Sequence, residues 1–257
     1  LFGGGAQAAL AAYGVIQGMS LPILLFPAAL IAVIADLIVP ELTEAQVQGR
    51  LRGLGYMLER LYRLGLFFSM AVAGACFFFA HPLGELIYSE PAAGQYIRLL
   101  APLVPIMYMD TLVDGMLKGV GEYRANMRYN IIDAATGLLL VWLLLPRYGV
   151  AGYLFSISAT ELLNFALSAA RLTRVTVFRL QPLCWLLTAA AAVGGWWLLR
   201  LIFGRLLSRT GQPLILLLLV FLYLACYGAA LLLCGALRRE ELSWLFSLLR
   251  GEKSPKT

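Results

Sequence analysis

The side chains best suited to chemistry are three charged residues within one strongly apolar stretch, MYMDTLVDGMLKGVGEYR. Asp110, Asp114 and Lys118 stand at i, i+4 and i+8, so a helix would place them on one face. An ionisable group inside a bilayer costs about 2.5–3.5 kcal/mol on insertion scales, so it persists where it faces a partner or a water-filled cavity. The spacing predicts a charged cavity wall, with Asp114 and Lys118 oriented as an ion pair. The alternative is that Asp114 and Lys118 lie at the membrane interface and snorkel.

Two neighbouring apolar stretches carry similar polar pairs. Asn130 and Asp133 are three residues apart, and Glu161 and Asn164 repeat that spacing. Each pair would share a helix face and could line the same cavity. Polar packing between helices without any transport role, or a hydrated helix end, would use the same residue types. Two arginines beside these stretches complete the candidate site: Arg98 and Arg128.

Other chemistries lack the residues that they need. His81 is the only histidine, so no histidine-based metal cluster or catalytic triad can be built. The sequence also lacks a G-x-x-x-x-G-K-[ST] phosphate loop, which argues against a built-in ATPase motor. We expect no enzymatic activity and no cofactor, with H⁺ or Na⁺ as candidate coupling ions. Four cysteines lie in apolar runs, none in a C-x-x-C pair, and are expected to be reduced: Cys76, Cys184, Cys226 and Cys234.

Composition identifies the surroundings of these residues. Of 257 residues, 61% are hydrophobic and 13% charged, and the mean hydropathy is +0.82. A soluble domain is nearer half apolar and a quarter charged. Apolar runs of about 20 residues recur, which is typical of helices that span a bilayer. The lipid bilayer is therefore the expected partner, and a disordered chain, a disulfide scaffold and a nucleic-acid module are excluded as main interpretations.

The chain is predicted to be an all-α, polytopic membrane helix bundle with seven spans. The first span is longer than a bilayer requires and contains Pro22 and Pro27, so it should tilt, kink or protrude before closing at Pro40. The fourth should end at Pro146. The predicted spans are 11–39, 64–80, 96–120, 126–145, 150–172, 183–203 and 213–236.

The segments outside the spans have their own patterns. Residues 41–63 carry an apolar stripe at helical spacing after a Thr43–Gln46 capping box, which predicts an amphipathic helix in the headgroup plane. Residues 81–95 hold Pro and Gly and predict an outward loop. A second surface helix is predicted over 240–250, before a disordered end.

Loop charges predict the orientation. Fifteen of the basic residues fall on one side of the seven spans and five on the other. Because Lys and Arg stay on the cytoplasmic side, the C-terminus is predicted to be cytoplasmic and the N-terminus outside. The chain begins at Leu1 with LFGGGAQAA, which is neither Met nor a signal peptide, so we expect an N-terminal part to be missing.

Short motifs then indicate a family. They are YG at 13–14, SLP at 20–22, FPAAL at 26–30, VPE at 39–41, LLAP at 99–102, YMD at 108–110, DGMLKG at 114–119, YNIID at 129–133, PRYG at 146–149 and GY at 152–153. This set resembles the stage V sporulation protein B-like polysaccharide flippases of the multidrug/oligosaccharidyl-lipid/polysaccharide exporter superfamily, which are MATE-like. The resemblance implies a linker over 1–10, a C-terminal lobe over 11–175, two additional helices over 176–236 and a cytoplasmic tail over 237–257. The N-terminal lobe would be the missing partner.

The resemblance also implies a function. Such flippases move lipid-linked oligosaccharides or cell-wall precursors across the bacterial cytoplasmic membrane by alternating access, and the substrate here would be a polyprenyl-diphosphate-linked sugar. Lys118, Arg128 and Arg98 would then meet the diphosphate. The coupling of an ion or proton would fall to Asp110, Asp133 and Glu161. Two alternatives stay open: a cation-coupled multidrug exporter, which should have net negative cavity walls, and a non-transporting membrane scaffold.

Overall fold

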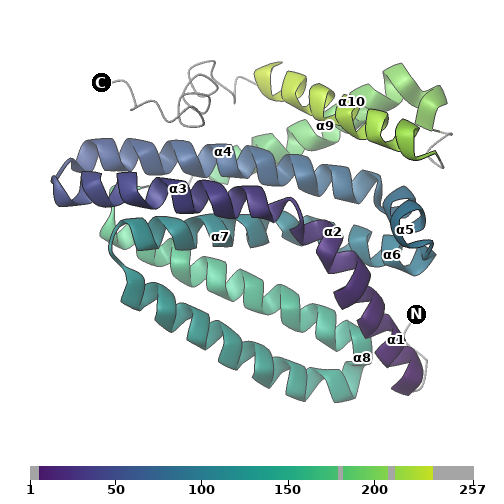
Figure 1. The fold of residues 1–257 in the computed structure, drawn as a ribbon, viewed down its shortest axis with the longest axis horizontal. Helices are drawn as coiled ribbons and strands as arrows, with labels where there is room; N and C mark the ends of the chain where they lie inside the picture. Colours follow the sequence, from purple (N-terminus) through teal and green to yellow (C-terminus); the bar gives the residue numbers. More distant parts are fainter. Residues whose placement is uncertain (1–5, 179–181, 208–211, 234–257) are drawn as a thin grey trace. The chain divides into compact units, whose positions relative to one another are not determined.

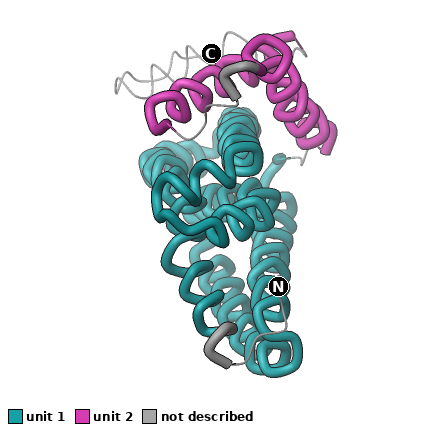
Figure 2. Tube along the Cα trace, turned by 90° about the vertical axis from the view of Figure 1, so that its right-hand side faces the viewer, with its two compact units in different colours: residues 1–180 teal, residues 181–257 magenta. Residues whose placement is uncertain are grey.

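The protein is described by a computed structural model over residues 6–178, 182–207 and 212–233, and every regular element within these ranges is a helix. The all-α prediction is confirmed for this part of the chain. The helices form two compact units, Leu1–Leu180 and Gln181–Thr257, which Figure 2 colours separately. Unit 1 contains every candidate site residue, so the fold of that unit decides what the site can be.

The first predicted span is broken, as its prolines predict. α1 (Ala6–Val15) continues through a π-helical turn, η1 (Ile16–Ser20), into α2 (Leu21–Leu25), and α3 (Ala28–Val47) follows after a bend of 51°. Pro22 and Pro27 each withhold a backbone donor from the helix. The Tyr108 hydroxyl donates to the Leu24 carbonyl at 2.5 Å, which satisfies an acceptor beside the bend. The residues 6–10 assigned to a linker are the first turns of α1.

The predicted surface helix over 41–63 is wrong, because two long helices share that segment. α3 continues through Pro40 to Val47, the chain turns at Gly49 with φ of 67°, and α4 (Leu51–Phe78) begins there. Thr43 caps no helix start. Its hydroxyl donates to the carbonyls of Val39 and Gly119 at 2.9 and 3.0 Å.

The part of the apolar stripe that lies within α4 beyond Leu51 is packed in protein, whereas Val47 and Leu51 are 82% and 55% exposed. Leu54, Leu58 and Leu61 are 2%, 0% and 2% exposed. A helix lying in a headgroup plane and a helix packed in a bundle have the same apolar period. The sequence pattern therefore predicted helical structure here, but neither the turn at Gly49 nor the packing that covers α4.

The predicted outward loop over 81–95 is also wrong, since it forms a helical hairpin. α5 (Ala80–Tyr88) and α6 (Pro91–Leu100) flank Ser89, whose φ is 54°. Gly84 and Gly94 lie so close that a Cβ on Gly84 would collide with the Gly94 backbone nitrogen. Pro91 starts α6, where its missing N–H leaves no bond unmade. Here Pro and Gly start and pack helices instead of breaking them.

α7 (Val104–Gly119) follows a 3₁₀ turn, η2 (Ala101–Leu103), and forms the centre of unit 1. It contacts α3, α4 and α8 (Figure 1). Gly115 lies against Ala35, and Gly119 lies against Leu42, both in α3. Close packing of α7 on α3 leaves its charged face turned toward α8.

α8 (Tyr123–Val175) is a long helix interrupted at Gly149, where φ is 56° and ψ is −135°. The chain reverses there, so a first arm (residues 123–148) and a second arm (residues 150–175) run back alongside each other (Figure 1). The predicted helix end at Pro146 is wrong, because the first arm continues through it. Gly152 permits the tight turn: a Cβ there would lie 2.5 Å from the Leu144 carbonyl oxygen.

Unit 2 contains α9 (Pro182–Leu207), bent at Phe203, and α10 (Pro213–Leu233). Gly195 of α9 lies against the backbone of Tyr227 in α10, which brings these two helices close together. The predicted surface helix over 240–250 and the tail over 237–257 lie outside the described residues, as do residues 1–5. The predicted domain boundaries stay predictions.

Among the residues that the structure describes, five helices are long and apolar enough to cross a bilayer, or six if the bent pair of α1–α2 and α3 is one span. Seven spans were predicted. α8 is counted once among the five although it contains the predicted fourth and fifth spans. The multi-span character of the chain is thus supported by length and composition.

Candidate functional site: a polar face between α7 and α8

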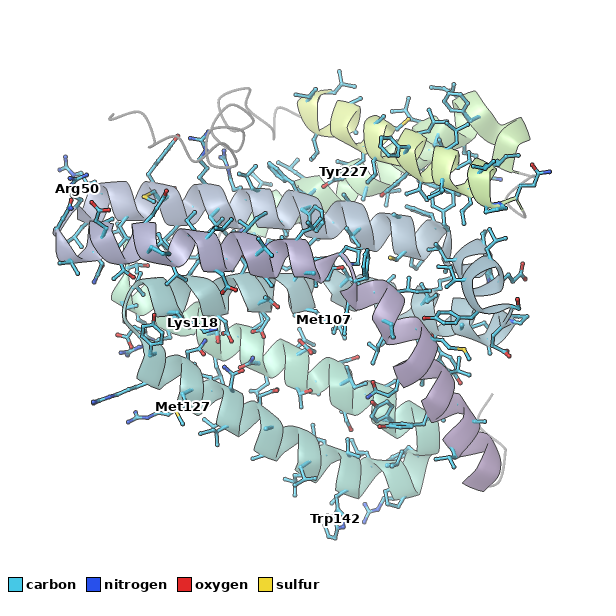
Figure 3. The ribbon with its side chains drawn as sticks, viewed as in Figure 1. Arg50, Met107, Lys118, Met127, Trp142 and Tyr227 are labelled. Atoms are coloured by element: carbon cyan, nitrogen blue, oxygen red, sulfur yellow. The ribbon has the colours of Figure 1, made fainter. Side chains whose placement is uncertain are left out.

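The charged face of α7 meets both arms of α8. Asp110, Asp114 and Lys118 are each half-buried on that face. Asn164 of the second arm is only 5% exposed, and its Nδ2 donates to Asp110 Oδ2 at 2.8 Å. Figure 3 shows polar side chains in the space between α7 and α8, with Lys118 near the end of α7. The predicted one-face arrangement of these residues is observed.

Asp114 joins all three helical segments. Ser168 of the second arm donates to Asp114 Oδ1 at 3.1 Å, and Asn130 of the first arm donates to Asp114 Oδ2 at 3.2 Å. Asn130 Nδ2 also lies 3.0 Å from Asn126 Oδ1. One carboxylate therefore holds both arms of α8 against α7, which requires the reversal at Gly149.

Two further carboxylates complete the face. Asp133 and Glu161 are half-buried, one on each arm of α8. They lie within electrostatic range of each other and of Asp110. Like charges repel strongly where the dielectric is low, so this group is stabilised when it takes up a proton or a cation. We define the polar face as these residues: Asp110, Asp114, Lys118, Asn126, Asn130, Asp133, Glu161, Asn164 and Ser168.

Several buried atoms of the polar face lack a hydrogen-bond partner among the described residues. They include three oxygens, Asp110 Oδ1, Asp133 Oδ1 and Asn164 Oδ1. Buried polar atoms are normally paired, and an unpaired one costs about 1–3 kcal/mol. These oxygens lie on both sides of the contact between α7 and α8, since Asp110 belongs to α7 and Asp133 and Asn164 to α8.

The predicted cations are arranged differently. Within the described residues, Lys118 forms no ion pair with Asp114, whose oxygens accept from Ser168 and Asn130 instead. Arg98 is exposed in α6 and lies over the Phe77 ring, 5.1 Å from its centroid, away from the polar face. Arg128 is exposed on the first arm. Only Lys118 of the three cations therefore belongs to the polar face.

Sequence reasoning missed two contacts that hold the ends of this region. Arg171 binds Glu122 through two nitrogens at 2.9–3.1 Å and links the base of the second arm to the start of α8. Gln17 of η1 donates to the Tyr153 hydroxyl at 2.5 Å, across 136 positions. No local spacing reveals either pair, because each joins segments that only the folded hairpin brings together.

A metal centre has no support in the described ranges, where no three His, Cys, Asp or Glu side chains are grouped to hold an ion. His81 is exposed in α5. Cys76 and Cys184 are buried, and Cys234 lies outside the described residues. The polar face, with its carboxylates and amides, remains the candidate site.

Comparison with known families gives this arrangement a context. The MatE family model matches residues 2–143, more than half of the chain. The chain belongs to the MatE family. The range that matches the MatE model runs from the N-terminal residues through α7 to the first arm of α8. Glu161, Asn164 and Ser168 lie beyond it, so a third of the polar face comes from the segment after the match.

A curated relative of this MatE chain is stage V sporulation protein B of Bacillus subtilis (strain 168). The two are 27% identical over 165 residues, which cover 63% of this chain and 32% of the relative. The chain thus spans about a third of the relative's length. This finding agrees with the family resemblance predicted from the motifs.

Proposed function

We propose that this MatE chain is the C-terminal part of a membrane transporter and that its polar face borders the passage through which the substrate moves. The proposal rests mainly on Asp110. Asp110 lies within a candidate membrane span, and its Oδ2 accepts a hydrogen bond from Asn164 of another helix. Its Oδ1 is buried and has no hydrogen-bond partner among the described residues. A membrane-embedded carboxylate of this kind is retained for function more often than for stability.

Coupling to a cation or proton follows from the same carboxylates. Asp110, Asp133 and Glu161 repel one another when all are charged, and a bound H⁺ or Na⁺ relieves that repulsion. Ion binding would therefore favour one packing of α7 against α8 and ion release another. Alternating access needs such a difference in affinity between two states.

The cargo we propose is a lipid-linked oligosaccharide on a polyprenyl diphosphate. The relative's similarity and the motif resemblance support it, together with cations at the basic end of α7 and α8. Lys118 lies on the polar face, and Arg128 is exposed nearby on the first arm. The protein would work with an N-terminal lobe in the bacterial cytoplasmic membrane, crossing it seven times if both arms of α8 cross, with its C-terminus in the cytoplasm.

A second candidate is a cation-coupled multidrug exporter. The polar face has four carboxylates and a single lysine. A net negative wall suits cationic drugs, whereas a diphosphate prefers positive groups. This charge balance is the observation that favours the second candidate.

Transport of the two cargoes by the full transporter in proteoliposomes separates the candidates. We expect a fluorescent polyprenyl-diphosphate sugar to move from one leaflet of the bilayer to the other several-fold faster when an H⁺ or Na⁺ gradient is imposed. A cationic dye should not be transported under the same conditions. Dye efflux without flipping would replace the proposal with the exporter. If the folded protein moved neither cargo, the proposal that it is a transporter would be wrong and a scaffold role would remain.

A further inference from the structure

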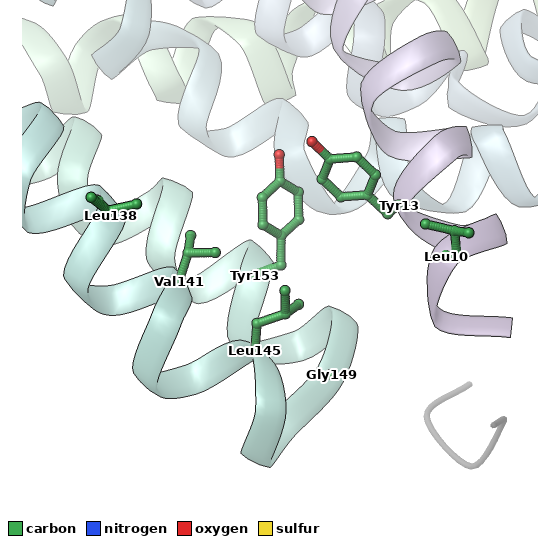
Figure 4. Close-up of a pocket in the computed structure, with 8 residues that line it drawn as sticks. Leu10, Tyr13, Leu138, Val141, Leu145, Gly149 and Tyr153 are labelled. Atoms are coloured by element: carbon green, nitrogen blue, oxygen red, sulfur yellow. The ribbon is translucent and has the colours of Figure 1, made fainter. Parts of the chain in front are cut away.

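The two ends of the α8 hairpin differ in chemistry. At the Gly149 reversal, a cavity of about 730 Å³ is lined by uncharged residues such as Leu10, Val141 and Tyr153 (Figure 4). At the other end, where α7 passes into α8, basic and amide side chains are found together. This end, which we call the base of the hairpin, has the residue types that bind a charged ligand.

The turn between α7 and α8 sets two of these residues opposite each other. The chain reverses around Gly121, whose φ is 82°, so that α7 and the first arm of α8 run in opposite directions (Figure 1). The hydrogen bond from Asn130 to Asp114 fixes the register of this pair of helices. One helical turn nearer the reversal are Lys118 on α7 and Asn126 on α8, so these two residues lie at the same level.

Lys118 carries an ammonium group whose neighbouring carboxylates are already occupied. Asp114, one turn before it, accepts hydrogen bonds from both arms of α8. Glu122, one turn after it, is bound through both oxygens by Arg171. Within the ranges that the structure describes, the half-buried Lys118 forms no ion pair and its side chain donates no hydrogen bond. Because withdrawing a charge from water without a partner is costly, this ammonium is available to an anion.

Asn126 supplies a second donor at the same level. The residue is 6% exposed, and its Oδ1 accepts a hydrogen bond from Asn130 at 3.0 Å. Its Nδ2 is buried and has no hydrogen-bond partner in the described part of the chain. Since the oxygen of the amide is directed at Asn130, the nitrogen is directed the other way, toward the turn. A buried donor without an acceptor destabilises the protein, so this amide also calls for a partner.

The ligand that suits this place is an oxyanion. An ammonium and an amide N–H₂ group are both donors, so a partner common to both must be an acceptor. Phosphate oxygens are strong acceptors, and lysine binds phosphate through charge-assisted hydrogen bonds. Arg124 and Arg128, both exposed at the start of α8, add positive charge nearby.

We propose that Lys118 and Asn126 form a binding site for a phosphate group at the base of the hairpin. The phosphate comes either from the diphosphate of the proposed cargo or from a phospholipid headgroup, which offer the same oxygens. The choice of cargo rests on the proposed function, whereas the site itself rests on the contacts of these two residues. Binding satisfies both donors without displacing the bonds that hold Asp114 and Glu122.

Calorimetric titration of the full protein in a neutral detergent with inorganic pyrophosphate tests the site. Lys118→Gln removes the charge and should weaken binding by about tenfold, as expected for the loss of a charge-assisted hydrogen bond. Arg147→Gln removes the same charge at the exposed far end of the first arm and should leave the affinity unchanged. Equal affinities of the two variants would overturn the proposal. So would a parent protein without measurable affinity, which would indicate that an acidic group of the N-terminal lobe already holds Lys118.

Asn126→Asp tests the second donor with little change of shape. The variant keeps an oxygen for the bond from Asn130 and replaces the free donor by a carboxylate oxygen that can pair with Lys118. It should bind pyrophosphate at least about tenfold more weakly, while its thermal midpoint stays the same or rises. An unchanged affinity would overturn the two-residue site and leave Asn126 a structural role. If this variant fails to fold, the parent protein and Lys118→Gln still decide the proposal.

Competition identifies the source of the phosphate. In phosphatidylcholine nanodiscs, a polyprenyl diphosphate should displace pyrophosphate at a concentration about tenfold lower than phosphatidylglycerol does, because it carries more phosphate charge. The reverse order would support the site and assign it to a phospholipid headgroup. Displacement by neither lipid would support it with a soluble phosphate compound as the ligand. Pyrophosphate binding by a protein that moves neither cargo would remove the proposed function and leave the site, and transport without such binding would do the opposite.

Discussion

Asp110→Asn is expected to reduce gradient-driven transport by the full protein by at least about tenfold while leaving its folding intact. The variant can still accept the hydrogen bond from Asn164, because the amide keeps an oxygen at the same place. It loses the charge that binds a cation or proton, and a hydrogen bond or contact to a charged group contributes about 1.5–3 kcal/mol. The measurement is the initial rate of cargo movement in proteoliposomes with and without the ion gradient.

The matched control is Asp36→Asn, the same chemical change on the exposed face of α3. It should transport at the unchanged rate. A rate for Asp110→Asn equal to that of this control would contradict a coupling role for the polar face. A thermal midpoint for each variant distinguishes lost transport from lost folding.

The second large effect concerns stability. Gly152→Ala places a Cβ 2.5 Å from the Leu144 oxygen and 2.8 Å from its carbonyl carbon. Both contacts are with backbone, so the arms of α8 must separate at the turn. Overpacking of this kind typically costs 1–3 kcal/mol, and we expect the midpoint of thermal unfolding to fall by roughly 4–8 °C.

Gly53→Ala provides the comparison for that measurement. Gly53 is exposed in α4, and a Cβ there would meet no atom within 4 Å. Alanine favours a helix by about 1 kcal/mol over glycine, so this variant should match or exceed the parent midpoint. If Gly152→Ala behaved like Gly53→Ala, the tight hairpin would not be what positions the polar face.

Much of the polar face was predictable from spacing. Asp110 and Asp114 stand four residues apart in one apolar stretch, and Glu161 and Asn164 stand three apart in another, which fixes a shared helix face in each case. That the two faces meet was a hypothesis, and the hydrogen bond from Asn164 to Asp110 supports it. Helical spacing therefore predicted which residues share a helix face, and the fold shows which of these faces contact each other.

The errors share a physical cause. Spacing does not reveal what covers a helix, so the stripe of Leu54, Leu58 and Leu61 was assigned to a membrane surface although it is buried. The Pro and Gly residues over 81–95 predict a loop, but Gly84 packs against a neighbouring helix and Pro91 starts one, and neither role is visible in local sequence. The Gln17–Tyr153 contact joins distant segments. Each of these features depends on tertiary structure, which one sequence does not encode locally.

The central claim is that the polar face borders water inside the membrane, and cysteine accessibility measures this most directly. In the full protein without its native cysteines, Glu161→Cys should react with a small membrane-impermeant thiol reagent. Leu162→Cys, one position on and 49% exposed, should stay unreactive because it faces lipid. Reaction at 161 and not at 162 is the predicted result. Equal protection of both positions would show a dry contact and would contradict the account.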